Sequence, residues 1–126
     1  MQACAAPRAN TNPDEAGTWI TDAMLDVYCQ LHDRGVAHSF ECWSENNLVG
    51  GIYGLVLGDI FFGESMFSKV KDASKYAMYY LCNTVRPFLI DAQVYSDHLS
   101  TLGAEKIDRS VFTSLVQSHL NNSLRL

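Results

Sequence analysis

The stretch 38–67, HSFECWSENNLVGGIYGLVLGDIFFGESMF, decides the fold of this chain. Three runs within it are rich in aromatic and branched apolar residues, a composition typical of strands, and they cover residues 38–43, 48–57 and 60–67. A polar run at 45–47 and the dipeptide Gly58-Asp59 separate these runs, and both suit tight turns. Tight turns join antiparallel strands, because parallel strands need a long crossover. The stretch therefore predicts a three-stranded antiparallel meander.

Helices are predicted on both sides of the meander. Upstream, Thr21 can cap a helix whose apolar positions recur at helical spacing, and Gly35 is its expected end. Downstream, Asp72 is the expected cap of a second helix, which ends before Pro87 because proline cannot continue it. This second helix is apolar over a wide arc, so we expect it to be buried on more than one side.

The rest of the chain adds short elements. A buried strand is predicted at 88–90, a helical turn at about 96–102 and a last helix after a cap at Asp108. This order is typical of an α+β fold with helices layered on a sheet. It is compatible with the GNAT-like acyltransferase fold, in which a meander is followed by helix, strand and helix. Residues 1–16 lack periodicity and are expected to be an irregular lead-in, so the domain is expected to cover 17–126.

Composition excludes several classes of protein. The chain has 126 residues, of which 48% are apolar, and a net charge of −5. This is enough for one domain with a core, and the acidic balance argues against a domain that holds nucleic acid by its own charge. No apolar run reaches the roughly 18–20 residues needed to span a membrane. The dispersed cysteines are typical of reduced thiols in a cytoplasmic protein, and the histidines lack metal-ligand spacing, so we expect neither a membrane partner nor a metal.

Three polar residues are candidates for chemistry. Glu64 interrupts an apolar strand, so its carboxylate either faces solvent or lies in a cleft, where a ligand's guanidinium or ammonium group would balance it. Asp91 and Gln93 end the short predicted strand, and their i, i+2 spacing places both on one face. The alternative for Asp91 is that it only caps the following turn. The pyrophosphate-binding turn of acetyl-CoA enzymes is absent from the sequence, which disfavours that class.

Several segments together resemble the leucyl/phenylalanyl-tRNA–protein transferase family. The matching motifs follow the family order and include GTWIT at 17–21, LVGGIYG at 48–54, GESMFS at 63–68 and D-x-Q at 91–93. The GESMFS and LVGGxYG strings are long and specific. The resemblance covers about residues 17–112.

The resemblance implies a GNAT-like domain that needs no cofactor and uses aminoacyl-tRNA as its donor. It implies transfer of Leu or Phe to proteins with N-terminal Arg or Lys, which marks them for degradation by the N-degron pathway. By the same resemblance, Glu64 holds the acceptor's cationic side chain, and Asp91 and Gln93 act at the reacting amine. Trp19 packs on the terminal adenosine of the tRNA. The implied pocket for the donor side chain consists of Ile52, Met66, Met78, Leu81, Val85 and Ile90.

Two departures from the family pattern bear on these expectations. Family members carry an N-terminal domain before the stretch that resembles 3–5, so we expect a truncated catalytic domain. The alternative is a non-catalytic module that binds N-terminal Arg or Lys. Ala92 stands where the family usually has cysteine, and because the middle of three strand residues faces away from its neighbours, we expect this change to alter packing only.

Overall fold

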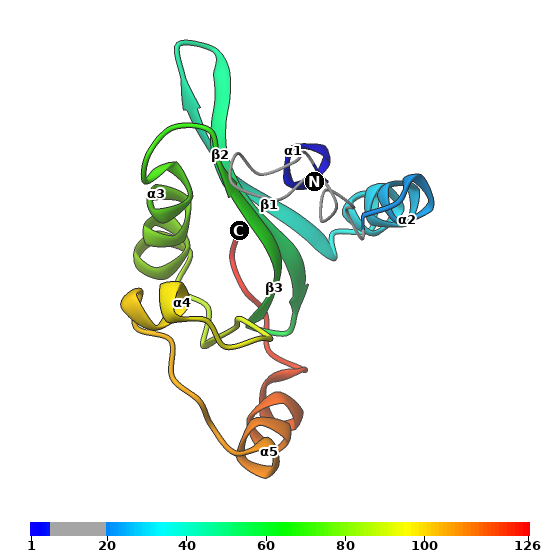
Figure 1. Ribbon diagram of the computed structural model, residues 1–126. Helices are drawn as coiled ribbons and strands as arrows, with labels where there is room; N and C mark the ends of the chain where they lie inside the picture. The colour runs from blue at the N-terminus through cyan, green and yellow to red at the C-terminus, as the bar shows by residue number, and fades with distance from the viewer. Residues whose placement is uncertain (6–19) are drawn as a thin grey trace.

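The computed structural model describes residues 1–5 and 20–126, and its architecture is α+β (Figure 1). In chain order the elements are α1 (Gln2–Ala5), α2 (Asp22–Asp33), β1 (Ala37–Ser44), β2 (Asn47–Leu57), β3 (Ile60–Ser68), α3 (Ala73–Tyr80), the π-helical turn η2 (Leu81–Val85), β4 (Leu89–Asp91), α4 (Asp97–Thr101) and α5 (Arg109–His119). The one-turn helix α1 lies in the segment expected to be irregular, so that expectation is wrong for 2–5. None of the described helices is long and apolar enough to cross a bilayer.

The strands form one mixed sheet in the order β1-β2-β3-β4. The first three pair antiparallel, and β4 pairs parallel to β3, so the predicted meander and following strand are confirmed. Each meander turn has two residues between paired strand ends. Glu45, Asn46 and Gly58 have positive φ angles of 48°, 69° and 65°, as two-residue hairpin turns require.

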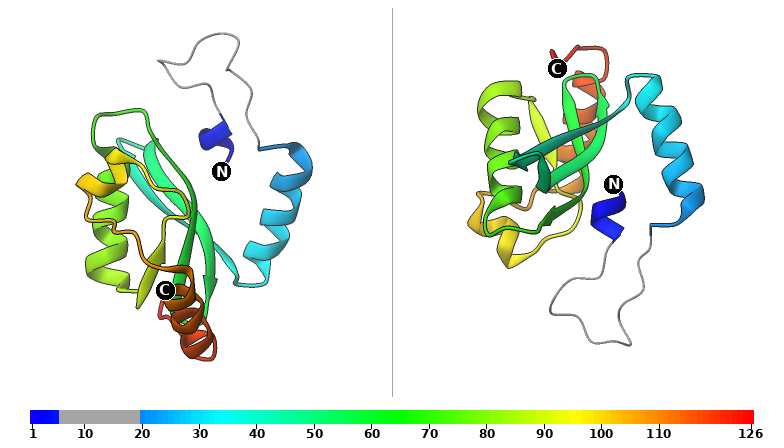
Figure 2. Two further views of the ribbon diagram at one scale, coloured as in Figure 1. Left: turned by 60° about the horizontal axis from the view of Figure 1, so that its bottom comes forward. Right: turned by 90° about the horizontal axis from the view of Figure 1, so that it is seen from above.

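Helix α3 covers one face of the sheet, and α1 and α2 lie on the other side (Figure 2). Small side chains allow α3 to approach closely: a Cβ on Gly50 would lie 2.5 Å from the Cβ of Ala73. Between α3 and the sheet, Phe61 and Leu81 have no exposed surface and form the core with Ile52 and Ala77. Burying such side chains is the main favourable contribution to folding, at about 1.5–3 kcal/mol each.

The outer face of α3 differs from the prediction. Tyr76, Tyr79 and Tyr80 are 68%, 67% and 52% exposed, so the helix is not buried on more than one side. The apolar arc is wide because tyrosine counts as apolar, yet its ring and hydroxyl tolerate an exposed position. Only the face bearing Ala73, Ser74 and Ala77 is buried against the sheet.

The helix caps agree only in part with the sequence. Thr21 caps α2 as expected, since its hydroxyl oxygen accepts a hydrogen bond from the Met24 amide at 3.3 Å. Asp72 and Asp108 occupy the cap positions of α3 and α5, but neither side chain makes a capping hydrogen bond. Asp72 instead forms an ion pair with Lys75 at 2.6 Å.

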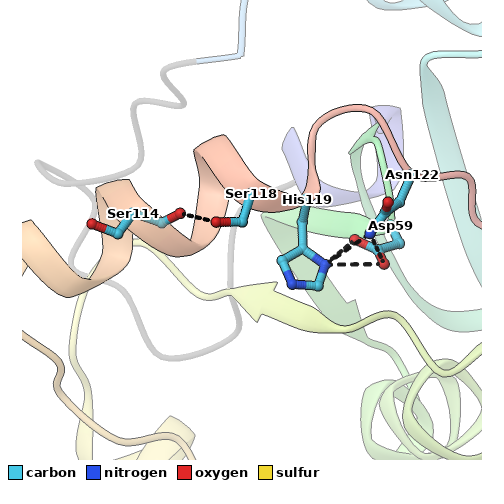
Figure 3. A network of polar contacts seen from close by, with 5 residues as sticks. All are labelled: Asp59, Ser114, Ser118, His119 and Asn122. Carbon is cyan, nitrogen blue, oxygen red and sulfur yellow. Dashed lines mark hydrogen bonds and ion pairs between the residues drawn. The ribbon is translucent and has the colours of Figure 1, made fainter.

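The C-terminal helix is fastened to the turn between β2 and β3 by a network of Asp59, His119 and Asn122, hereafter the Asp59 network (Figure 3). His119 Nδ1 donates to Asp59 Oδ1 at 2.9 Å, and Asn122 Nδ2 donates to Asp59 Oδ2 at 3.0 Å. The His119 ring also stacks on Phe88, with centroids 3.5 Å apart. A Cβ on Gly58 would lie 2.0 Å from the His119 carbonyl oxygen, so this docking requires glycine there.

Candidate functional site

The site lies where β4 separates from β3. The two strands pair only from Ile60 to Phe62, opposite Leu89 to Asp91, while β3 continues to Ser68. The edge of β3 is therefore open beyond Gly63. A cavity of about 950 Å³, called the first cavity here, occupies this opening. Its wall comes from α1, the second half of β3, α3, the end of β4 and α4.

A β-bulge positions Glu64 in the wall of the first cavity. Tyr53 pairs with Ser65 and Gly54 pairs with Gly63, so Glu64 is an extra residue with no partner on β2. Gly54 permits the bulge, because a Cβ there would lie 2.1 Å from the Phe62 carbonyl oxygen. The extra residue also changes which side chains share a face of the strand.

That change of face is visible in the core. Phe61 and Met66 are five positions apart, and an odd separation in a regular strand would place them on opposite faces. With the bulge between them, both pack against the core beneath α3. Alternation along the sequence does not reveal this feature, and the only local signal is the pair of glycines, Gly54 and Gly63, beside the bulge.

Glu64 is half-buried and lines the first cavity, so of the two alternatives the position in a cleft describes its carboxylate. Its Oε1 accepts a hydrogen bond from Gln93 Nε2 at 3.1 Å. Within residues 1–5 and 20–126, it forms no ion pair with a lysine or arginine. A half-buried carboxylate held by an amide, without a cation, has remaining capacity to accept hydrogen bonds from a charged ligand.

Two tyrosines behind Glu64 were not singled out from the sequence. Burial raises the pKa of Tyr28 to about 12, with further contributions from the charge of Glu64 and a hydrogen bond to it. Tyr53 packs edge-on against Tyr28, with centroids 5.5 Å apart, and burial also raises its pKa. Its hydroxyl is buried and has no hydrogen-bond partner among the described residues. Tyr28 shows no polar signal in the sequence, since it belongs to the apolar stripe of α2.

Asp91 and Gln93 come together for a reason other than the predicted one. Only Asp91 belongs to β4; Gln93 lies in a turn with a φ angle of 61°, so strand alternation does not align them. The turn is closed by the Asp91 carboxylate, whose Oδ1 accepts from the Gln93 amide nitrogen at 2.8 Å. Asp91 therefore does cap the following turn, and the same turn brings the Gln93 side chain to Glu64. Ala92 does not face away, because it lines the first cavity.

The apolar wall of the first cavity contains part of the expected donor pocket. Four of the six residues line it, namely Ile52, Met66, Met78 and Ile90. Leu81 and Val85 are not among the lining residues. Leu81 has no exposed surface, and Val85 packs against the same core, so both lie behind the wall rather than in it. Trp19 lies outside the described residues.

Other polar groups complete the cavity wall. His98 lines the first cavity from α4. At the end nearer α3, the Ser68 hydroxyl donates to Ser74 Oγ at 2.8 Å and accepts from the Ser74 amide. In the part of the chain that the structure describes, no three His, Cys, Asp or Glu side chains gather in a way that could hold a metal. The arrangement offers a carboxylate, an amide and a second carboxylate beside an apolar surface.

Comparison of the sequence with family profiles and with curated proteins gives the same family in both cases. A family profile described as leucyl/phenylalanyl-tRNA protein transferase matches residues 1–117. The curated leucyl/phenylalanyl-tRNA–protein transferase of Cellvibrio japonicus is 53% identical over 119 residues, which cover 92% of this chain and 49% of that protein. Its counterpart from Pseudomonas fluorescens is 50% identical over 124 residues, covering 96% and 53%. The chain therefore spans about half the length of the curated relatives it matches.

Proposed function

Because the chain belongs to the leucyl/phenylalanyl-tRNA–protein transferase family, we propose that it transfers leucine or phenylalanine from aminoacyl-tRNA to the N-terminal Arg or Lys of a protein. The observation that carries this proposal is Glu64, a half-buried carboxylate without a cationic partner among the described residues. The proposal includes a GNAT-like fold, a cytoplasmic location and a role in marking proteins for degradation. The meander followed by α3 and a parallel β4 supports the fold.

Glu64 takes the cationic side chain of the acceptor in this proposal. A partly buried carboxylate is stabilised by a guanidinium or ammonium group, and Arg can bind both carboxylate oxygens at once. The Gln93 amide already holds one of these oxygens, and Tyr28 supports the carboxylate from α2. These contacts fix the carboxylate before the ligand arrives, so less ordering is needed on binding.

The apolar wall takes the side chain of the donor. Met66 and Met78 are unbranched and polarizable, so they can adapt to side chains of different shape. Ile52 and Ile90 complete this surface. Such a wall suits both leucine and phenylalanine. Leu81 and Val85 support it from behind, and Trp19 stays assigned to the tRNA adenosine by family resemblance alone.

The reaction is aminolysis of an ester. The acceptor nitrogen attacks the ester carbonyl carbon, a C–N bond forms, and the C–O bond to the tRNA ribose breaks. The amine loses a proton and the ribose oxygen gains one, so the step is balanced. An α-amino group has a pKa of about 7.7–8.0, which leaves on the order of 10–20% of it neutral at pH 7. Orientation of this amine therefore contributes more than a strong base.

Gln93 and Asp91, the two polar groups at the turn, have different roles in this reaction. An amide is a very poor base, so Gln93 orients the amine. Asp91 accepts the proton or stabilises the developing charge, directly or through Gln93. Asp91 Oδ1 accepts a hydrogen bond from the Gln93 backbone amide, whereas Asp91 Oδ2 has no hydrogen-bond partner among the described residues.

The test is a transfer assay with the 126-residue chain, leucyl-tRNA and a peptide that begins with Arg. We expect labelled leucine on the peptide, and we expect Glu64→Gln to reduce transfer and peptide binding at least tenfold. Glu45→Gln, in the exposed turn between β1 and β2, is the matched control and keeps both. Full turnover in Asp91→Asn together with its loss in Gln93→Ala would contradict the assigned roles.

The same assay separates the alternative function. Peptide binding that disappears in Glu64→Gln, without any transfer by the unaltered chain, would identify a non-catalytic module for N-terminal Arg or Lys. Peptide binding that is unaffected by Glu64→Gln would refute both functions.

A further inference from the structure

A second cavity lies on the other side of the turn that holds Asp91 and Gln93. Its volume is about 840 Å³, and it is enclosed by β4, the residues after it, α4, the loop 102–108 and the start of α5. A cavity of this size is in the range of small-ligand sites. It shares Ile90, Asp91, Ala92 and Leu99 with the first cavity, so the two cavities adjoin.

The turn 91–93 forms the ridge between the two cavities. Asp91 lines both cavities. Gln93 lines the second cavity, and its Nε2 donates a hydrogen bond to Glu64 in the wall of the first cavity at 3.1 Å. The left-handed φ angle of 61° at Gln93 and the 2.8 Å hydrogen bond from its amide to Asp91 hold the ridge in shape. A ligand bound to both Glu64 and this ridge therefore has an adjoining space into which it can continue.

The second cavity carries cationic groups away from the ridge. Lys106 and Arg109 line it, and neither forms an ion pair within the described residues. The Lys106 ammonium lies 4.0 Å from the ring centroid of Tyr95, a cation–π contact that holds the charge in the cavity wall. The acidic groups of this wall are Glu105 and Asp91, and the Asp91 carboxylate already accepts a hydrogen bond from the Gln93 backbone amide. The far part of the cavity thus has two cations and one carboxylate.

We propose that the second cavity receives the second and third residues of the acceptor protein, and that Lys106 and Arg109 make it favour acidic side chains there. The inference rests on the proposed function, in which Glu64 holds the first side chain and the ridge holds the amine. Successive Cα atoms are about 3.8 Å apart, so the Cα atoms of residues two and three lie within about 4–8 Å of the first residue's Cα, beside the ridge. The second cavity is the space available at that distance beside Asp91 and Gln93.

The test measures peptide binding to the 126-residue chain by calorimetry at low salt, without tRNA. The peptides begin Arg-Asp-Asp, Arg-Ala-Ala and Arg-Lys-Lys and are otherwise identical. Exposed charge pairs have modest energies, so we expect the acidic peptide to bind about five- to tenfold more tightly than the basic one. This ratio is expected to fall below about twofold in Lys106→Gln/Arg109→Gln, and to shrink with added salt. Arg34→Gln, at the exposed end of α2, is the matched control and keeps the ratio.

Each outcome of this test decides a different point. If the unaltered chain binds all three peptides equally, or if the double variant keeps the ratio, the inference is wrong while the proposed function stands. If the chain binds none of the peptides, or if Glu64→Gln leaves binding unchanged, the proposed function is wrong and the inference falls with it. In the transfer assay, a double variant that changes the KM for leucyl-tRNA and not for the peptide would assign the two cations to tRNA phosphates instead.

Discussion

The replacement Gly58→Ala tests how α5 is held against the sheet. Gly58 has a φ angle of +65°, and a Cβ there would lie 2.0 Å from the His119 carbonyl oxygen. Gly35 offers a matched control, because its φ angle is +72° and a Cβ there would meet nothing within 4 Å. Both replacements carry the cost of a left-handed alanine, about 1–2 kcal/mol. Only Gly58→Ala must also displace the end of α5.

The additional cost follows from the contacts that this displacement breaks. The His119–Asp59 hydrogen bond involves a charged group, and such bonds contribute about 1.5–3 kcal/mol. The stacking of His119 on Phe88 adds about 0.5–1.5 kcal/mol, the range for aromatic pairs. Since the Asp59 and His119 side chains are only 20% and 21% exposed, solvent weakens these contacts little. We expect Gly58→Ala to lower the free energy of unfolding about 2–4 kcal/mol more than Gly35→Ala.

Urea unfolding followed by circular dichroism measures this difference, provided that the slope m is unchanged. A second measurement uses His119→Ala in both backgrounds. If Gly58→Ala has already broken the Asp59 network, removing the imidazole costs little further stability, so the two changes are less than additive. A difference between the two glycine variants of less than about 1 kcal/mol would refute the reasoning, because it would leave only the backbone term.

Three further outcomes are expected. Thr21→Ala removes the hydroxyl that caps α2 and is expected to lower the unfolding free energy by about 1 kcal/mol in the same urea experiment; an unchanged midpoint would contradict the cap. The pKa of Tyr28 is raised from 10.0 to about 12, so on raising the pH the unfolded chain loses the phenol proton before the folded chain does, and the free energy of unfolding falls between pH 10 and 12. Tyr28→Phe is expected to make this fall shallower, and an unchanged pH dependence would contradict the raised pKa. Leu81→Ala is expected to cost about 2–5 kcal/mol because the side chain is fully buried, whereas Tyr79→Ala on the exposed face stays within about 0.5 kcal/mol; equal losses, measured by thermal unfolding, would contradict the assignment of Leu81 to the core.

The sequence predicts the meander well because its signals are local. The polar run 45–47 and the dipeptide Gly58-Asp59 favour tight turns by their own backbone preferences, and the runs beside them have strand composition. Caps are less predictable, since an aspartate can pair with a nearby lysine instead, as Asp72 does with Lys75. The exposed tyrosines of α3 show a further limit, because apolar spacing does not reveal how many sides of a helix another element covers.

The sequence predicts which residues belong to the site better than it predicts how they are arranged. Glu64 and Asp91 are unusual in their local context, which is why the sequence singles them out. Their placement depends on a bulge and a left-handed turn, and both arise from close approaches between strands or from a side-chain cap. Tyr28 behind Glu64, and the core position of Leu81 rather than a place in the cavity wall, depend on packing between distant elements. Periodicity along one segment carries no information on such contacts.

The Asp59 network joins residues that are 60 positions apart, and Glu64, Asp91, Gln93, Lys106 and Arg109 all lie between them. During synthesis on a ribosome, the chain grows at about 5–20 residues per second, so the meander leaves the exit tunnel several seconds before His119. Until then α5 cannot complete the wall of the second cavity, although α3 and β4 can already pack on the meander. Asp59 and His119 thus set the moment of biosynthesis at which the second cavity acquires its boundary at α5, whereas the first cavity, which α5 does not line, can form earlier.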